Sequence, residues 1–365
     1  MSNNNKDDNN VSKSKEIYED IIFQENKCLK VYTTLVDSVG KHDETTLIAA
    51  LNLAEIWIGL YKLREVDELL TSIYDICLKK KGTIEIRCIQ SLAFTRFKQF
   101  RFHESLKLML RQRELVGDCI ELCENIGHVY NSLGQIDHAE IEFNKALTFI
   151  TNNNDNNEKE FVKKNKIGGI LLGLGQIKQA QKEYPQALDY LNKALNNYRS
   201  LYDEEHSLIA KSLMYIGGVY ERMYQLKQAE EYYRECIRIF IITCGEKTPL
   251  TATAWKHLSD VLLMRGKYKE AEKYMKKAIM KEVDFTPLRL NTVCELLMKL
   301  LDIQTHKETI EEKRSSELVE IVAKACAASK EQQIKEDGNL AVLYKTSAEI
   351  LEEARVKWSQ TWNAY

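Results

Sequence analysis

The chain has 365 residues, of which 44% are hydrophobic and 29% charged, a balance that suits several globular domains or one long repeat array. Lysine and arginine number 52 against 54 aspartates and glutamates, and the net charge of −2 excludes a global basic field for nucleic acid or acidic membranes. Only three prolines occur, which favours long helices.

The N-terminal segment begins with a polar, low-complexity tail. Residues 1–13, which start MSNNNKDDNN, contain almost no apolar residues and are predicted to be disordered, because they cannot bury a core. Residues 14–44 form the next predicted region, in which Ser14 to Ser38 has the pattern of an amphipathic helix. We expect this helix to cover the N-terminal end of the structure that follows.

Residues 45–283 carry one helical pattern six times. In the stretch from His206 to Phe240, Leu213 and Gly217 share one helix face, a turn follows near 224–226, and Ala229 and Tyr233 share a face of a second helix. Small residues such as Gly217 and Ala229 let two helices approach closely, and large ones fill the space beside them. The pattern therefore predicts a helical hairpin.

The equivalent positions recur at regular intervals. In chain order they are Ile56, Leu92, Ile126, Leu174, Ile216 and Leu258, separated by 36, 34, 48, 42 and 42 residues. The longest interval contains TNNNDNNEKE at 151–160, which is predicted to be an expanded loop between helices.

Residues 284–365 continue the helical pattern in a degenerate form. Pro287 suits the first turn of a helix at 290–301, and further helices are predicted at 311–329 and 340–358. A repeat array needs end units with a polar outer face, and the charged run HKETIEEKRSSELVE at 306–320 meets that need. We expect a degenerate repeat and capping helices in this region.

Four stretches carry a family resemblance. They are NIGHVYNSLGQIDHAEIEFNKAL at 125–147, LGLGQIKQAQKEYPQALDYLNKAL at 172–195, YIGGVYERMYQLKQAEEYYRECI at 215–237 and HLSDVLLMRGKYKEAEKYMKKAI at 257–279. They resemble the tetratricopeptide repeat, in which two antiparallel helices pack through small residues at fixed places. The 42-residue spacing is similar to that of kinesin light chains and related adaptors. The resemblance implies an all-α, right-handed α-solenoid of about six hairpins with capping helices.

No motif for metal, phosphate or acid–base chemistry is found. Cys119, Cys123 and His128 lie close in sequence but lack the further ligands of a zinc site, so buried thiols are the simpler interpretation. The glycine-rich run IGGILLGLGQ at 167–176 lacks the phosphate-binding order, and packing explains it better. The histidines form no HExxH motif. We expect a protein that is not an enzyme and that needs no cofactor or metal.

The cysteines and the apolar runs indicate the compartment. Nine cysteines, an odd number, are scattered along the chain, and no apolar segment opens it. This pattern indicates free thiols in a reducing compartment. No apolar run is long enough to cross a bilayer. We expect a cytoplasmic protein without membrane insertion, with cytoskeletal or ciliary association as an open option.

The resemblance also implies a binding surface, because the first helix of each hairpin lines the concave face in this family. The groove-facing positions would be Arg87, Gln90, Phe94, Glu121, Glu124, Asn125, His128, Asn131, Gln176, Gln179, Lys211, Tyr215, Arg222, Lys256, His257 and Asp260. Their amides suit the backbone of an extended peptide, and an aromatic ring offers an anchor for a side chain. We expect a peptide or protein partner, and no nucleic acid.

Co-chaperones of this family hold a C-terminal carboxylate with a Lys–Asn–Asn–Lys–Arg clamp. The corresponding places here hold Gln90, Phe94, Asn125, Gly169 and Gly173, of which only Asn125 agrees. A carboxylate clamp for chaperone tails is therefore not expected. The predicted function is an adaptor or scaffold that binds its partner in the groove. A regulatory or structural subunit of a larger complex and a cytoskeleton- or cilium-linked cargo adaptor remain alternatives.

Overall fold

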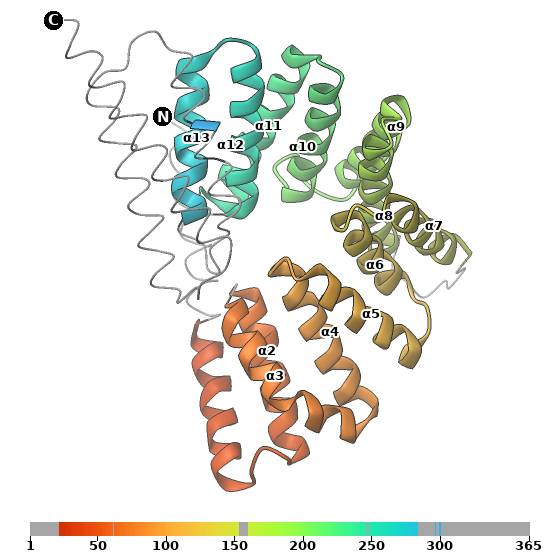
Figure 1. Ribbon diagram of the computed structural model, residues 1–365, viewed down its shortest axis with the longest axis vertical. Helices are drawn as coiled ribbons and strands as arrows, with labels where there is room; N and C mark the ends of the chain where they lie inside the picture. Colours follow the sequence, from red (N-terminus) through yellow and green to blue (C-terminus); the bar gives the residue numbers. More distant parts are fainter. Residues whose placement is uncertain are drawn as a thin grey trace, which may run out of the picture. The chain divides into compact units, whose positions relative to one another are not determined.

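A computed structural model describes residues 22–60, 62–152, 160–246, 248–283, 296 and 299–300. Every regular element within those ranges is an α-helix (Figure 1). The predicted tail at 1–13 and the predicted helices at 311–329 and 340–358 lie outside the described residues. The chain divides into two units, one up to Lys163 and one from Lys164 onward.

The first unit consists of an N-terminal helix and three hairpins. The helix covers residues 22–38. The hairpins pair α2 (Glu44–Gly59) with α3 (Leu63–Lys80), α4 (Gly82–Lys98) with α5 (Phe102–Val116), and α6 (Ile120–Ser132) with α7 (Ile136–Asn152). Glu25 of the N-terminal helix accepts a hydrogen bond from the indole N–H of Trp57 at 2.8 Å and also contacts Lys62. These contacts place the helix beside the first hairpin.

The second unit repeats the same construction. It pairs α8 (Glu160–Ala180) with α9 (Tyr184–Arg199), α10 (Ser207–Arg222) with α11 (Leu226–Cys244), and α12 (Pro249–Met264) with α13 (Tyr268–Val283). The first residues of α8 belong to the first unit. Figure 1 shows α10 beside α11 and α12 beside α13. The helix α7 ends at Asn152 and α8 begins at Glu160, so the first and last residues of the loop predicted at 151–160 are helical, and residues 153–159 lie outside the described residues.

The five hairpins from α4 to α13 each turn at a residue with left-handed backbone geometry. These residues are Phe100, Gly134, Lys182, Tyr224 and Gly266, with φ between 58° and 72°. Their spacing of 34, 48, 42 and 42 residues is the spacing of the sequence repeat. The predicted repeat register is confirmed, because the same turn falls at the same place in five hairpins.

Small residues form the contact between the two helices of each hairpin from α4 to α13. They are buried in pairs twelve residues apart, namely Ala93 and Ser105, Gly127 and Ala139, Gly175 and Ala187, Gly217 and Ala229, and Ser259 and Ala271. Where one member is serine, its hydroxyl donates to the carbonyl of the other: Ser105 to Ala93 at 2.8 Å, and Ser259 to Ala271 at 2.7 Å. The predicted small-residue contact is therefore confirmed in both units.

The glycines leave room for large side chains of the second helix. A Cβ atom added to Gly175 would lie 2.5 Å from Leu191, and one added to Gly217 would lie 3.1 Å from the ring of Tyr233. Gly168 has the same role, since its Cβ would lie 2.6 Å from Tyr198. The glycines at 168 and 175 therefore serve packing, as the sequence indicated.

Each unit contains one hydrophobic cluster of buried side chains. The first extends from Leu47 to Val129, and the second from Leu172 to Leu300. Leu296 and Leu300 are buried in the second cluster, so at least this part of the predicted helix at 290–301 belongs to the core. Each unit is an α-solenoid with its own core.

Candidate functional site

A pocket of about 300 Å³ opens on the first helices of the three hairpins of the first unit. The helices α2, α4 and α6 supply most of its walls, and α5 supplies its floor. The lining residues are Glu55, Ile58, Arg87, Gln90, Ser91, Ala93, Phe94, Met109, Gln112, Leu122 and Asn125. Four of the residues predicted for the groove, Arg87, Gln90, Phe94 and Asn125, are thus brought together at one place.

The charged residues of this pocket neutralise each other. Arg87 donates to Glu55 at 2.7 Å and to the side-chain oxygen of Asn52 at 2.9 Å. Glu55 and Arg87 are the only charged residues of the lining. The lining of the pocket therefore carries no net charge, and Arg87, predicted as a groove-facing residue, is ion-paired there.

Three amide side chains face this space without a partner. Across the described part of the chain, the side chains of Gln90, Gln112 and Asn125 make no hydrogen bond. Gln90 and Asn125 are exposed, but Gln112 is only 9% exposed. The amide atoms of Gln112 are not fully closed off from solvent, so water in the pocket can satisfy them, and a ligand that displaces this water must replace those hydrogen bonds.

Sequence reasoning missed Gln112, because it lies on the second helix of its hairpin. Its register gave a signal that could have revealed it. Ser105, Met109 and Gln112 are spaced at i, i+4 and i+7, so a polar residue occupies the core-facing stripe of α5.

Apolar side chains complete the pocket. Met109 and Leu122 are 5% and 3% exposed, whereas the ring of Phe94 is 37% exposed. The ammonium of Lys98 lies 5.1 Å from the centre of the Phe94 ring, on which it makes a cation–π contact. The pocket thus combines an apolar surface with amides that can both donate and accept.

The remaining predicted residues of α6 lie outside this pocket. His128 has its Nε2 3.9 Å from Glu124 and its ring 5.0 Å from that of Phe143, at an edge-on angle of 80°. Asn131 is half-buried, and Glu121 is exposed. These predicted residues lie along α6 but do not line the pocket.

In the second unit, Tyr215 packs against the core and is not a free anchor. Burial raises the pKa of Tyr215 to about 12, although a hydrogen bond with Gln176 opposes the shift. The ammonium of Lys211 lies 5.9 Å from its ring centre. Gln179, also on α8, lies beside Gly218, whose added Cβ would be 3.5 Å from the Gln179 amide nitrogen.

The facing parts of α10 and α12 form a second polar cluster. Glu221 accepts a hydrogen bond from the Tyr233 hydroxyl at 2.7 Å and lies 3.7 Å from Nδ1 of His257. Asp260 accepts from Lys299 at 2.8 Å. The sequence predicted His257 and Asp260 here but missed Glu221, Tyr233 and Lys299. Glu221 meets Tyr233 within one hairpin and His257 of the next hairpin, and a linear pattern shows neither polar contact.

The carboxylates of this cluster differ in their environment. Burial raises the pKa of Glu221, but hydrogen bonds with His257 and Tyr233 outweigh it and hold the pKa below its ordinary value. Burial also raises the pKa of Asp260, and there it prevails over Lys299 and His257. Of the other predicted residues, Lys256 is half-buried and Arg222 is exposed.

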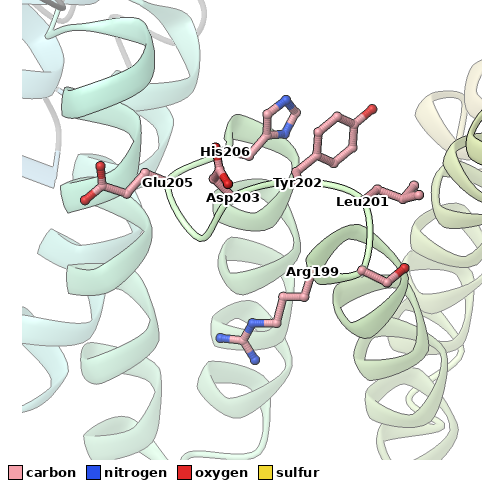
Figure 2. A pocket seen from close by; sticks show the side chains of 7 residues that line it. Arg199, Leu201, Tyr202, Asp203, Glu205 and His206 are labelled. Carbon is pink, nitrogen blue, oxygen red and sulfur yellow. The ribbon is translucent and has the colours of Figure 1, made fainter.

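A shallow depression of about 410 Å³ lies at the loop between α9 and α10. Figure 2 shows the rings of Tyr202 and His206 side by side, with Arg199 extending on the other side of the loop. The two rings stack with centroids 3.8 Å apart. Two of its charged residues are already paired, Arg199 with Glu204 at 3.2 Å and Glu205 with Arg238 at 3.0 Å.

No candidate metal site is found among the described residues. Within them, no group of three or more histidine, cysteine, aspartate or glutamate side chains could hold a metal ion. Cys123 is buried with its sulfur 3.8 Å from Asp118, and burial raises its pKa to about 11. That environment favours the neutral thiol. Over the same residues, none of the helices is long and apolar enough to span a membrane.

The profile of the tetratricopeptide repeat family matches the chain at residues 120–153, 167–242 and 208–279. These ranges coincide with the hairpins from α6 to α13. These residues carry tetratricopeptide repeats. No protein of curated function matches the chain in sequence.

Solved structures share the fold of this chain over most of its length. NprR in complex with its cognate peptide NprX has a TM-score of 0.60 at 17% identity, covering 93% of this chain and 98% of NprR. A tetratricopeptide repeat protein from Parabacteroides merdae has a TM-score of 0.55 at 16% identity, with 80% and 98% covered. A Rap protein complexed with Competence and Sporulation Factor has a TM-score of 0.53 at 18% identity, with 95% and 98% covered.

Proposed function

We propose that this protein is a non-enzymatic scaffold that binds an extended peptide segment of a protein partner. The site would be the exposed face of α2, α4 and α6. The observation that carries the proposal is the set of amides, Gln90, Gln112 and Asn125, that line one pocket without hydrogen-bond partners in the described structure.

The chemistry of these amides matches that of a peptide backbone. Each amide offers both a donor and an acceptor, and each peptide group needs one of each. The helices that present the amides are held by their own hairpin cores, so the surface is formed before the ligand arrives. A preformed surface binds with less loss of conformational entropy than one that must first become ordered.

The fold supports a peptide as the class of ligand. NprR, whose solved structure covers nearly the whole of this chain, is in complex with its cognate peptide NprX. At 17% identity this likeness concerns the fold, and the residues that would contact a peptide here are those of this chain.

We also propose that the protein acts in the cytoplasm as an adaptor. All seven cysteines in the described ranges are free, including the buried Cys77 and Cys88. Free thiols suit a reducing compartment.

Panning of random linear peptides against the immobilised full chain tests the proposed function. We expect the recovered peptides to bind the wild type and the Asn144→Ala variant equally, because Asn144 is an exposed amide on α7 outside the pocket. The double variant Gln90→Ala/Asn125→Ala should bind about tenfold or more weakly, since each lost hydrogen bond is worth about 1 kcal/mol. Failure to recover any binding peptide, or equal binding by all three proteins, would contradict the proposal.

A further inference from the structure

We propose that the pocket formed by α2, α4, α5 and α6 is a subsite for one large, uncharged apolar side chain of the bound peptide. Leucine, methionine and phenylalanine are the side chains of this class. The amides of Gln90, Gln112 and Asn125 would hold the peptide groups on either side of it. This inference rests on the proposed function and names the residue type that the site selects.

The size of the pocket limits its occupant. Its volume of about 300 Å³ lies at the lower end of the range for small-ligand sites. A space of this size accommodates one side chain with its adjoining peptide groups. A folded partner surface or a large cofactor would not enter it.

The charge of the pocket selects an uncharged side chain. Glu55 and Arg87 are bonded to each other at 2.7 Å, so neither is available to a charged ligand group. The remaining surface includes Phe94, Met109 and Leu122, which are apolar. A charged side chain would lose its hydration here without gaining an unpaired charge among the lining residues, which is unfavourable.

The burial of Gln112 indicates that the ligand also brings polar groups. This side chain is 91% buried, lines the pocket and makes no hydrogen bond within the described structure. A purely apolar ligand would seal the amide away from water and leave it unsatisfied. A peptide group satisfies the amide, because it presents an N–H and a carbonyl beside the apolar side chain.

Blocked amino acids test both parts of the inference. The probes are N-acetyl-leucine N-methylamide, its glycine counterpart without a side chain, and its glutamate counterpart with a charge. The readout is the ¹³C-methyl NMR signal of Met109 in the full chain, assigned with Met109→Leu. We expect saturable shifts with the leucine probe and at least about tenfold weaker binding of the other two, because burial of a leucine side chain is worth roughly ten- to hundredfold in affinity.

The variant Gln112→Leu tests the polar part. It should bind the leucine probe about fivefold or more weakly, because the peptide group loses its partner. Asn144→Leu, the same change at an exposed amide of α7, should bind like the wild type. Gln90→Leu provides a second test at an exposed position and should weaken binding in the same direction.

Each contrary result has a distinct meaning. Equal binding of the three probes, no shift of Met109, or unchanged binding by both Gln112→Leu and Gln90→Leu would overturn the subsite. If panned peptides bind the chain but leave the Met109 signal in place, the subsite fails while the proposed function stands. If no panned peptide binds, the proposed function itself fails.

Discussion

His206 shows how one side chain ends a loop and begins a helix. It is the N-cap of α10, and its Nδ1 accepts a hydrogen bond from the backbone N–H of Leu208 at 3.3 Å. The ring also stacks on Tyr202. An acceptor nitrogen requires the neutral imidazole, and a cation at a helix N-terminus opposes the helix dipole. Burial accordingly lowers the pKa of His206, although the nearby charge of Asp203 opposes the shift.

The stability of the protein should therefore decrease as acid protonates His206. Because the pKa is lower in the folded state than in the unfolded chain, this contribution is present above the ordinary histidine pKa of about 6.5. It is lost as the pH falls through the folded value. His206→Asn keeps an N-cap acceptor and cannot titrate, so it should match the wild type at pH 8 and exceed its stability at pH 5.5.

Urea unfolding at the two pH values measures this effect. His206→Ala, which removes the cap, should lose about 0.5–2 kcal/mol at pH 8. If the free energy of unfolding falls by the same amount in the wild type and in His206→Asn between pH 8 and pH 5.5, the cap does not titrate.

At the level of the hairpin, the packing depends on a small residue opposite a large one. Gly175 on α8 leaves room for the buried Leu191 on α9, as Gly127 does for Phe143 and Gly217 for Tyr233. The identity of the large residue varies between hairpins, whereas the small partner is maintained. Close packing leaves little space for even one added methyl group.

Gly175→Ala should destabilise the protein by about 1–3 kcal/mol, because the new Cβ would lie 2.5 Å from Cδ2 and 2.6 Å from Cγ of Leu191. Gly59→Ala is the matched control, since an added Cβ there has no atom within 4 Å. Calorimetry should show a lower Tm for Gly175→Ala only. Adding Leu191→Ala should cost less in the Gly175→Ala background than in the wild type, because the two changes relieve each other. Additive effects would mean that the clash is absent.

At the scale of the molecule, each unit contains its own hydrophobic cluster. The first cluster includes Leu51 and Ile89, and the second includes Ile216 and Leu258. In a repeat protein each hairpin contacts mainly its neighbours, so the cost of a core change is expected to remain near the site of the change.

Hydrogen exchange followed by mass spectrometry checks this expectation. Gly175→Ala should accelerate amide exchange in α9 to α11 and leave α2 to α5 as in the wild type. Gly127→Ala, whose Cβ would lie 3.0 Å from the Phe143 ring, should instead accelerate amide exchange in α2 to α5 and leave α9 to α11 as in the wild type. Acceleration across both units by either variant would indicate one cooperative fold instead.

The repeat pattern was readable from sequence because it depends on local features. The small-residue pairs twelve residues apart and the turn positions recur along the chain, and each depends on contacts within one hairpin. The resemblance to the repeat family implied that Gln90 and Asn125 share one face, and both line the same pocket. That these residues bind a peptide stays a prediction.

The sequence by itself determined the hairpins, their number and their register, because these follow from residue size and helical period over a few dozen residues. Only the tertiary structure decided which side chains meet between hairpins. It paired Arg87 with Glu55 across 32 residues, placed Glu221 beside His257, and left Gln112 buried without a partner. These outcomes depend on how neighbouring hairpins stack, and stacking is a matter of three-dimensional distance that no linear spacing records.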